Sequence, residues 1–219
     1  MSGGGPEDQK AAARFPSDRP VSDGPLAAVW ADLWDRLEEA AARGKPAFHL
    51  PTLATVDAHH APAARVVVLR HADRAAGVVG CHTDARSPKA AAVLENSAAS
   101  WCFYDRPGKV QVRVSGGTKL IGEGPEWEAA WAATSPSARR CYLGDLPPGT
   151  VTDTPEANIP AVYEHRDPTD AESEPGRRHF RLLRTTAGRV EWLSLAHAGH
   201  RRALFTRSGD GWASTWAAV

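Results

Sequence analysis

Residues 64–71 read Ala-Arg-Val-Val-Val-Leu-Arg-His, an apolar run with an arginine near each end. Such β-branched runs are typical of strands, whose backbone amide groups are regularly spaced. Residues 83–90 follow as Thr-Asp-Ala-Arg-Ser-Pro-Lys-Ala. A serine before a proline is typical of a helix start, with the hydroxyl at the cap and the proline in the first turn. Residues 110–114, Val-Gln-Val-Arg-Val, then place an amide inside a later strand. This order predicts a sheet protein with a helix inserted between strands.

The residues before this region predict an amphipathic helix over 25–43. Apolar residues recur there at helical spacing, namely Leu26, Val29, Trp30, Leu33, Trp34 and Leu37. Two tryptophans on one stripe favour a packing role over a ligand role. Short β-branched runs at 47–56, 64–71, 77–82, 99–104 and 109–121 predict strands. Residues 73–77 and 105–109 carry turn residues that predict hairpin connections.

The second half of the chain continues the same texture. Two helices are expected between residues 125 and 142, divided at Ser135-Pro136, and 144–176 is expected to be a long irregular loop. Strands are expected at 178–185, 189–195, 202–206 and 212–217. Many short strands with few helices predict a β-rich α+β fold, a closed or split β-barrel with peripheral helices.

Composition bounds the domain organisation and the partners. Residues 1–22 are poor in large apolar groups and are expected to form a disordered tail before a single domain over 23–219. The 26 basic and 26 acidic residues cancel, which argues against nucleic acid or an anionic membrane surface as partner. The three cysteines show no metal-ligand or disulfide spacing, so we expect no metal site. No apolar run is long enough to cross a bilayer, and a cytoplasmic protein is expected.

Three segments together predict a phosphate site. Arg65 would bind a phosphate bidentately, while the start of the helix near Ser87 offers free N–H groups. Thr83 and Lys89 would add hydroxyl and ammonium donors around the same anion. Solvated charges beside an ordinary capped helix are the simpler alternative for each segment alone. Their convergence within one β-turn-β unit favours a phosphate dianion.

An amide and a late cation extend this site to a flat heterocycle. Gln111 can donate and accept hydrogen bonds, which matches the edge of an isoalloxazine ring, although a surface-facing glutamine is the alternative. Arg202 would stabilise negative charge on a reduced flavin, and Trp192 lies on the preceding strand. Flavin mononucleotide (FMN) is therefore the expected cofactor.

The same residues, in the same order, resemble the pyridoxamine 5′-phosphate oxidase-like family of FMN-binding split barrels. The family patterns R-x-V-L-L-K, Y-T-x-x-x-S-R-K, R-Q-V, F-W-Q-G and R-L-H-D-R align with segments starting at Arg65, His82, Val110, Glu191 and Ala198. The resemblance covers about 25–142 and 178–219. It implies homodimers with FMN at the subunit interface. The FMN-binding set that it implies, together with the residues argued above, is Arg65, Val66, Val67, Val68, Arg70, His82, Thr83, Ser87, Lys89, Gln111, Trp192 and Arg202.

Departures from the family patterns bear on the substrate. Pro88 replaces a phosphate-binding arginine, and His82 replaces a tyrosine. Of the residues that clamp the substrate phosphate in the true oxidases, only those at Arg70 and His200 keep related chemistry, and Ala198 replaces an arginine. These changes argue against oxidation of vitamin B6 phosphates. A small anionic substrate is expected near Arg70, Arg139, Arg140 and His200.

The expected function is an FMN-dependent oxidoreductase with an unidentified substrate. Catalytic residues are not assigned, because flavin chemistry needs mainly binding and orientation from side chains. A true pyridoxamine or pyridoxine 5′-phosphate oxidase and an FMN reductase using a nicotinamide cofactor are alternatives. Two others are a non-catalytic flavin-binding module and a haem-handling relative that uses His197 or His200.

Overall fold

The computed structural model describes residues 26–219, so the expected tail over 1–22 lies outside the described residues. Within this range nine strands form one antiparallel sheet. The strands are β1 (Thr52–Val56), β2 (Pro62–Val66), β3 (His71–Asp73), β4 (Val78–Asp84), β5 (Ala98–Asp105), β6 (Val110–Ile121), β7 (Phe180–Ser194), β8 (Arg201–Ser208) and β9 (Gly211–Ala217). The α-helices are α1 (Leu26–Ala42), α2 (Pro88–Glu95), α3 (Pro125–Ala133), α4 (Pro136–Arg139) and α5 (Asp170–Ser173). Short 3₁₀ helices are η3 (Ala47–His49), η4 (Arg140–Tyr142), η5 (Ala161–Tyr163) and η6 (Glu174–His179).

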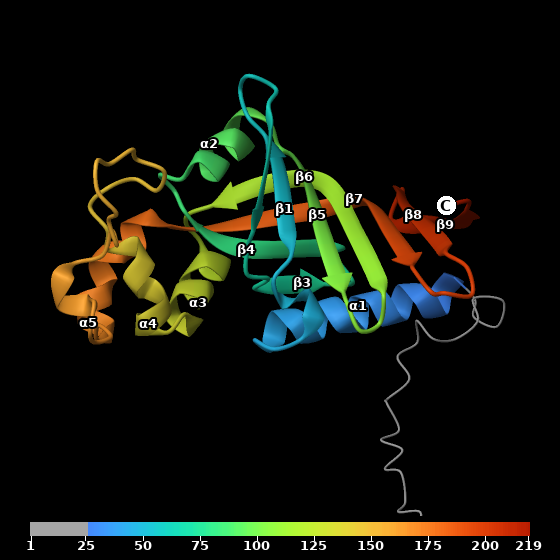
Figure 1. The fold of residues 1–219 in the computed structure, drawn as a ribbon, viewed down its shortest axis with the longest axis horizontal. Coiled ribbons are helices and arrows are strands. Elements are labelled where there is room, and N and C mark those ends of the chain that lie inside the picture. Colours follow the sequence, from blue (N-terminus) through green and yellow to red (C-terminus); the bar gives the residue numbers. More distant parts are fainter. Residues whose placement is uncertain (1–25) are drawn as a thin grey trace, which may run out of the picture.

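The strand order is β2-β1-β5-β6-β7-β4-β3, and β8 and β9 extend from β7. The sheet curls without closing, which confirms the expected β-rich split barrel (Figure 1). Helix α1 lies below the sheet and α2 above it in this view, and both contribute buried side chains to the main core, whereas α3, α4 and α5 gather at the end opposite β8 and β9 (Figure 1). No helix within 26–219 is long and apolar enough to cross a membrane.

The predicted strand over 64–71 is divided in the structure. Strand β2 ends at Val66 and β3 begins at His71. Between them the amides of Val67 and Leu69 donate to carbonyls of residues 51 and 49, whereas the amide of Arg70 donates to residue 80 on β4. The segment 67–70 therefore changes hydrogen-bond partner from one part of the sheet to the other. This segment joins β2 and β3, the two ends of the strand order.

The two strands predicted over 178–185 and 189–195 form the single strand β7. Pairing with β6 skips Gly188, because Ser115 pairs with Arg189 and Gly116 pairs with Ala187. The extra residue forms a β-bulge, which turns the strand without ending it. At Gly116 a Cβ would lie 1.9 Å from the carbonyl oxygen of Thr186, so only glycine fits this close approach.

Helix α1 confirms the packing role of its apolar stripe. Leu33, Trp34 and Leu37 are fully buried. The Trp30 ring lies 4.9 Å from that of Phe205 and 4.7 Å from that of Trp212, measured between centroids. Burial of such large apolar side chains is the main stabilising term for the helix.

The expected irregular loop over 144–176 is partly helical. It contains η5 and α5, and α5 begins with a capping box between Thr169 and Glu172. The sequence Thr-Asp-Ala-Glu is the usual pattern of such a box, and four residues are too few for hydrophobic periodicity to reveal a helix. The predicted strand over 47–56 also changes, because its first residues form η3.

A second, smaller core fixes the helices at the end of the barrel. Trp127 and Trp131 of α3 pack against Tyr142, Phe180 and Leu182. The indole N–H of Trp127 donates to the carbonyl of Phe180 at 2.9 Å. This contact holds α3 against β7.

Candidate functional site

The start of α2 gathers the hydroxyl and ammonium groups that the sequence predicted at a phosphate site. Ser87 caps the helix by accepting the amide of Ala90. Thr83 Oγ1 lies 3.0 Å from Ser87 Oγ, and Lys89 Nζ donates to Thr83 Oγ1 at 3.1 Å. Both hydroxyl residues are buried. We call Arg65, Thr83, Ser87 and Lys89 the phosphate seat.

Arg65 completes the seat from β2. Its register partner is the core residue Leu53, so its side chain starts on the inner face of the sheet. One guanidinium nitrogen donates to Thr55 Oγ1 at 2.9 Å and to the carbonyl of Leu53 at 3.2 Å. Within residues 26–219, neither Arg65 nor Lys89 forms an ion pair with a carboxylate.

Burial disfavours the charged forms of Arg65 and Lys89 in the ligand-free protein. It lowers the pKa of both Arg65 and Lys89, and the charge of Arg65 lowers that of Lys89 further. The neighbouring Cys81 does not offset them, because burial raises the pKa of its thiol to about 12 and keeps it neutral. Asp84 raises the pKa of Lys89 as a lesser influence and forms no ion pair with it. Two partly desolvated cations without an ion-paired acid are compatible with an anion site.

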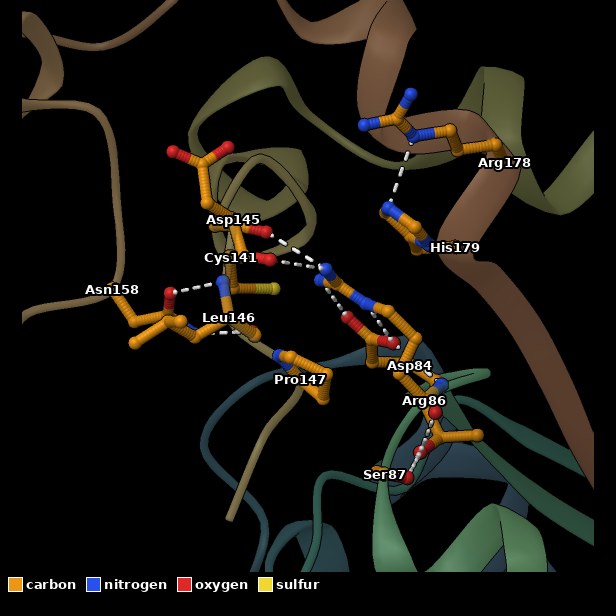
Figure 2. Close-up of polar contacts among 12 residues, drawn as sticks. Asp84, Arg86, Ser87, Cys141, Asp145, Leu146, Pro147, Asn158, Arg178 and His179 are labelled. Atoms are coloured by element: carbon orange, nitrogen blue, oxygen red, sulfur yellow. Dashed lines mark hydrogen bonds and ion pairs between the residues drawn. The ribbon is translucent and has the colours of Figure 1, made fainter. Parts of the chain in front are cut away.

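A segment of the long loop covers the first turn of α2. Arg86 binds both carboxylate oxygens of Asp84 and donates to the carbonyls of Gly144 at 2.9 Å and Asp145 at 3.3 Å (Figure 2). Asn158 closes the loop on itself through two hydrogen bonds to the backbone of residue 146 (Figure 2). At Gly149 a Cβ would lie 3.2 Å from the Pro88 ring, so the loop packs directly on the helix start.

Gln111 and Arg202 lie on the outer face of the sheet. Register pairs Gln111 with Leu193 and Leu193 with Arg202, so the three side chains share one row. The guanidinium of Arg202 is ion-paired with Glu191, which also binds Arg113. The structure thus brings the predicted amide and late cation together, on the face opposite the phosphate seat.

Trp192 faces the other way. It pairs with Val112, whose side chain points to the inner face, and the indole is only 3% exposed within the core. Trp192 therefore cannot contact a ring lying against Gln111 of the same chain. Val66 is 62% exposed on the outer face, Val67 is buried and Val68 is half-buried, as the alternation of an extended chain requires.

The predicted substrate residues are not brought together within one chain. Arg70 lines a cavity of about 620 Å³ next to His82, whereas His200 lines a different one. Arg139 is buried and donates to the carbonyl of Trp131 at 2.8 Å and to Asp170 at 2.9 Å. Arg140 donates to the carbonyl of Tyr163 at 2.9 Å. A shared substrate site for these residues stays a prediction.

Three ionisable residues of the Arg70 cavity were missed in the sequence. They are His71, Glu126 and Arg184. Arg184 stands in the apolar strand run Phe-Arg-Leu-Leu-Arg-Thr-Thr over 180–186, and a charge inside such a run was the available signal. Glu126 and His71 gave no signal, because only the fold brings them to Arg184.

Comparison with known proteins identifies the fold and the domain. Residues 28–122 match the family model described as pyridoxamine 5′-phosphate oxidase, FMN-binding domain. A pyridoxamine 5′-phosphate oxidase-related, FMN-binding protein of Nostoc punctiforme PCC 73102 is 24% identical, with a TM-score of 0.68 over 87% of this chain and 97% of its own. PhzG from Burkholderia lata 383, solved with tetrahydrophenazine-1-carboxylic acid, is 20% identical, with a TM-score of 0.67 over 91% and 96% of the two chains. Residues 28–122 of this chain thus match the pyridoxamine 5′-phosphate oxidase, FMN-binding domain, and the chain shares the split-barrel fold of the two solved structures.

Proposed function

We propose that the protein is an FMN-dependent oxidoreductase that acts on a small anionic molecule. The observation that carries the proposal is the phosphate seat, where Arg65 and Lys89 stand without acidic partners at the start of α2. The family domain matched over 28–122 is FMN-binding by description, and the compared protein of Nostoc punctiforme is also described as FMN-binding.

The donors of the seat suit the phosphate of FMN. Arg65 and Lys89 offer two positive charges for a dianion, and the hydroxyl groups of Thr83 and Ser87 offer further donors. The free N–H groups of the eight-residue helix α2 add a partial positive charge. A bound FMN would supply the two-electron chemistry, and the chain would hold the cofactor, orient the substrate and exclude water.

The placement of the candidate residues on two faces of the sheet supports a homodimer. The phosphate seat lies on the inner face, whereas Gln111 and Arg202 lie on the outer face. A cofactor that contacts both sets is most simply held between two copies. The outer face is suited to such contact, because Val66 is 62% exposed and Tyr104 is 46% exposed there.

A non-catalytic FMN-binding role is the second candidate. It is favoured by the placement of Arg139 and Arg140, whose guanidinium groups are committed to contacts within the chain. The three free cysteines are compatible with a cytoplasmic location for either function.

Reconstitution with FMN tests the proposal. The protein should bind FMN with a flavin absorbance spectrum, should be bleached by a reduced substrate or nicotinamide donor without air, and should regain its colour in air. Reduction without any donor-specific turnover would support the second candidate, and failure to bind FMN would refute both. Light scattering should give twice the chain mass, and Tyr104→Glu should shift it toward one chain, with Arg106→Glu as the control.

A further inference from the structure

The polar cavity lined by Arg70 and His82 lies on the other face of β4 from the phosphate seat. Its volume is about 620 Å³, a size that suits a small organic ligand. Alternation along β4 puts Gly80 and His82 on the side of this cavity, whereas Cys81 and Thr83 face the seat. The two sites therefore share one strand as their common wall.

Arg184 is held in this cavity by its surroundings. It is 8% exposed and pairs in register with Gly80. At Gly80 a Cβ would lie 2.5 Å from Arg184 Nη1, so the guanidinium occupies the space that a side chain would take. Arg184 Nε donates to Glu126 Oε1 at 2.7 Å, and this bond fixes its orientation. Arg70, by contrast, is exposed and forms no ion pair within residues 26–219.

The charge of the cavity is one positive unit at neutral pH. Arg70 and Arg184 contribute two positive charges, and Glu126 contributes one negative charge. Burial lowers the pKa of His71, and burial together with the charges of Arg184 and Arg70 lowers the pKa of His82 to about 3. Both imidazoles are therefore neutral and act as hydrogen-bonding groups.

The rest of the wall is small and mostly apolar. The alanines that line it are Ala41, Ala42, Ala130, Ala133 and Ala138. Thr134 and Ser135 add hydroxyl groups. Such a wall leaves room for a compact apolar body beside the charged end of the cavity.

We propose that this cavity binds a small monoanion, a carboxylate with an apolar body, whose charge is neutralised by Arg70 while Arg184 donates hydrogen bonds from a fixed position. The role of this ligand as substrate rests on the proposed function, whereas its binding does not. A dianion such as a phosphate monoester would leave an uncompensated negative charge beside Glu126. Glu126 is thus the residue that makes the cavity prefer a monoanionic ligand to a dianionic one.

Calorimetric titration at pH 8 compares the affinity for a monoanion, benzoate, with that for a dianion, phenyl phosphate. Each ligand is titrated into the full chain with and without FMN. The wild type should prefer benzoate. Arg70→Gln should weaken the binding of benzoate about 10-fold or more, which is the scale of a lost hydrogen bond to a charged group. Glu126→Gln keeps the amide oxygen as acceptor for Arg184 and should shift the affinity ratio toward phenyl phosphate by about 10-fold. Arg106→Gln, an exposed arginine in the hairpin outside the cavity, should change neither affinity.

Two results overturn the inference. The first is that Arg70→Gln and Arg106→Gln change the affinity for benzoate equally, or that no variant binds benzoate at all. The other is a ratio of the two ligands that Glu126→Gln leaves unchanged. Parallel FMN titration separates the proposals. The expected benzoate pattern without FMN binding refutes the oxidoreductase, whereas FMN binding without that pattern refutes the carboxylate site.

Discussion

Lys89→Met separates ligand binding from folding at the phosphate seat. Lys89 makes one hydrogen bond, to Thr83 Oγ1, and has no carboxylate partner within residues 26–219. Burial and the charge of Arg65 lower its pKa, so the ammonium is disfavoured in the FMN-free protein. Methionine keeps most of the stem and removes the buried charge. The substitution should therefore harm only the complex.

The expected magnitudes follow from the contacts that change. A hydrogen bond to a charged group contributes about 1.5–3 kcal/mol, which corresponds to about 10- to 150-fold in the dissociation constant of FMN. Arg65→Ala should weaken the binding of FMN by a similar factor. The free energy of unfolding of FMN-free Lys89→Met should stay within about 1 kcal/mol of the wild type, on the stable side, because a poorly solvated charge is lost.

Flavin fluorescence titration and urea unfolding of the FMN-free protein measure the two quantities. Lys119→Met, at an exposed lysine on β6, is the matched control and should bind FMN as the wild type does. The reasoning is refuted if Lys89→Met binds FMN with wild-type affinity. It is also refuted if the variant loses more than about 2 kcal/mol of stability, because Lys89 would then be a structural residue.

Three further predictions test the fold and the loop. Gly116→Ala should destabilise the protein by about 1–3 kcal/mol in urea, because its Cβ meets backbone, whereas Gly117→Ala, with no atom within 4 Å, should be neutral or stabilising. A histidine in the unfolded chain has a pKa of about 6.5, whereas His82 in the folded protein has a pKa of about 3. Below pH 6.5 the unfolded state therefore binds a proton that the folded state does not, and the free energy of unfolding should decrease by up to about 1.4 kcal/mol for each unit by which the pH is lowered. His82→Gln should show a shallower fall in melting temperature between pH 6.5 and 4, and equal slopes would contradict the assignment. Arg86→Gln should speed amide exchange over 144–150 about 10-fold, since two hydrogen bonds to that loop are lost, and unchanged exchange there would show that the loop is held by other contacts.

The contacts among Thr83, Ser87 and Lys89 were predictable because these residues are close in sequence, whereas phosphate binding there stays a prediction. Thr83, Ser87 and Lys89 lie within seven positions, and Ser-Pro is a direct signal of a helix start. Only Arg65 had to be placed by a tertiary contact, and the strand run that carries it indicated an approach to the next strand. The barrel class followed in the same way from many short β-branched runs.

The errors concern features that long-range pairing decides. The run over 64–71 has uniform strand propensity, but its hydrogen-bond partners change between Leu69 and Arg70, and no residue type marks that change. Gly188 indicated a turn, whereas the partner strand β6 continues past it and converts the expected break into a bulge. That Trp192 and Gln111 meet one ring stays a prediction, and the register with Val112 shows only that they face opposite sides within one chain.

Strand β4 links the two proposed sites through its register. Pairing with β7 is continuous from Val78–Thr186 to Asp84–Phe180, and this fixes which side chains face each site. A shift of one residue would send His82 to the phosphate seat and Thr83 to the carboxylate cavity, because side chains alternate along a strand. The close approach of Arg184 to Gly80 opposes such a shift, since every other residue of β4 carries a Cβ that would meet the guanidinium. Gly80 therefore serves both sites: it makes room for the arginine of one and holds in register the hydroxyl of the other.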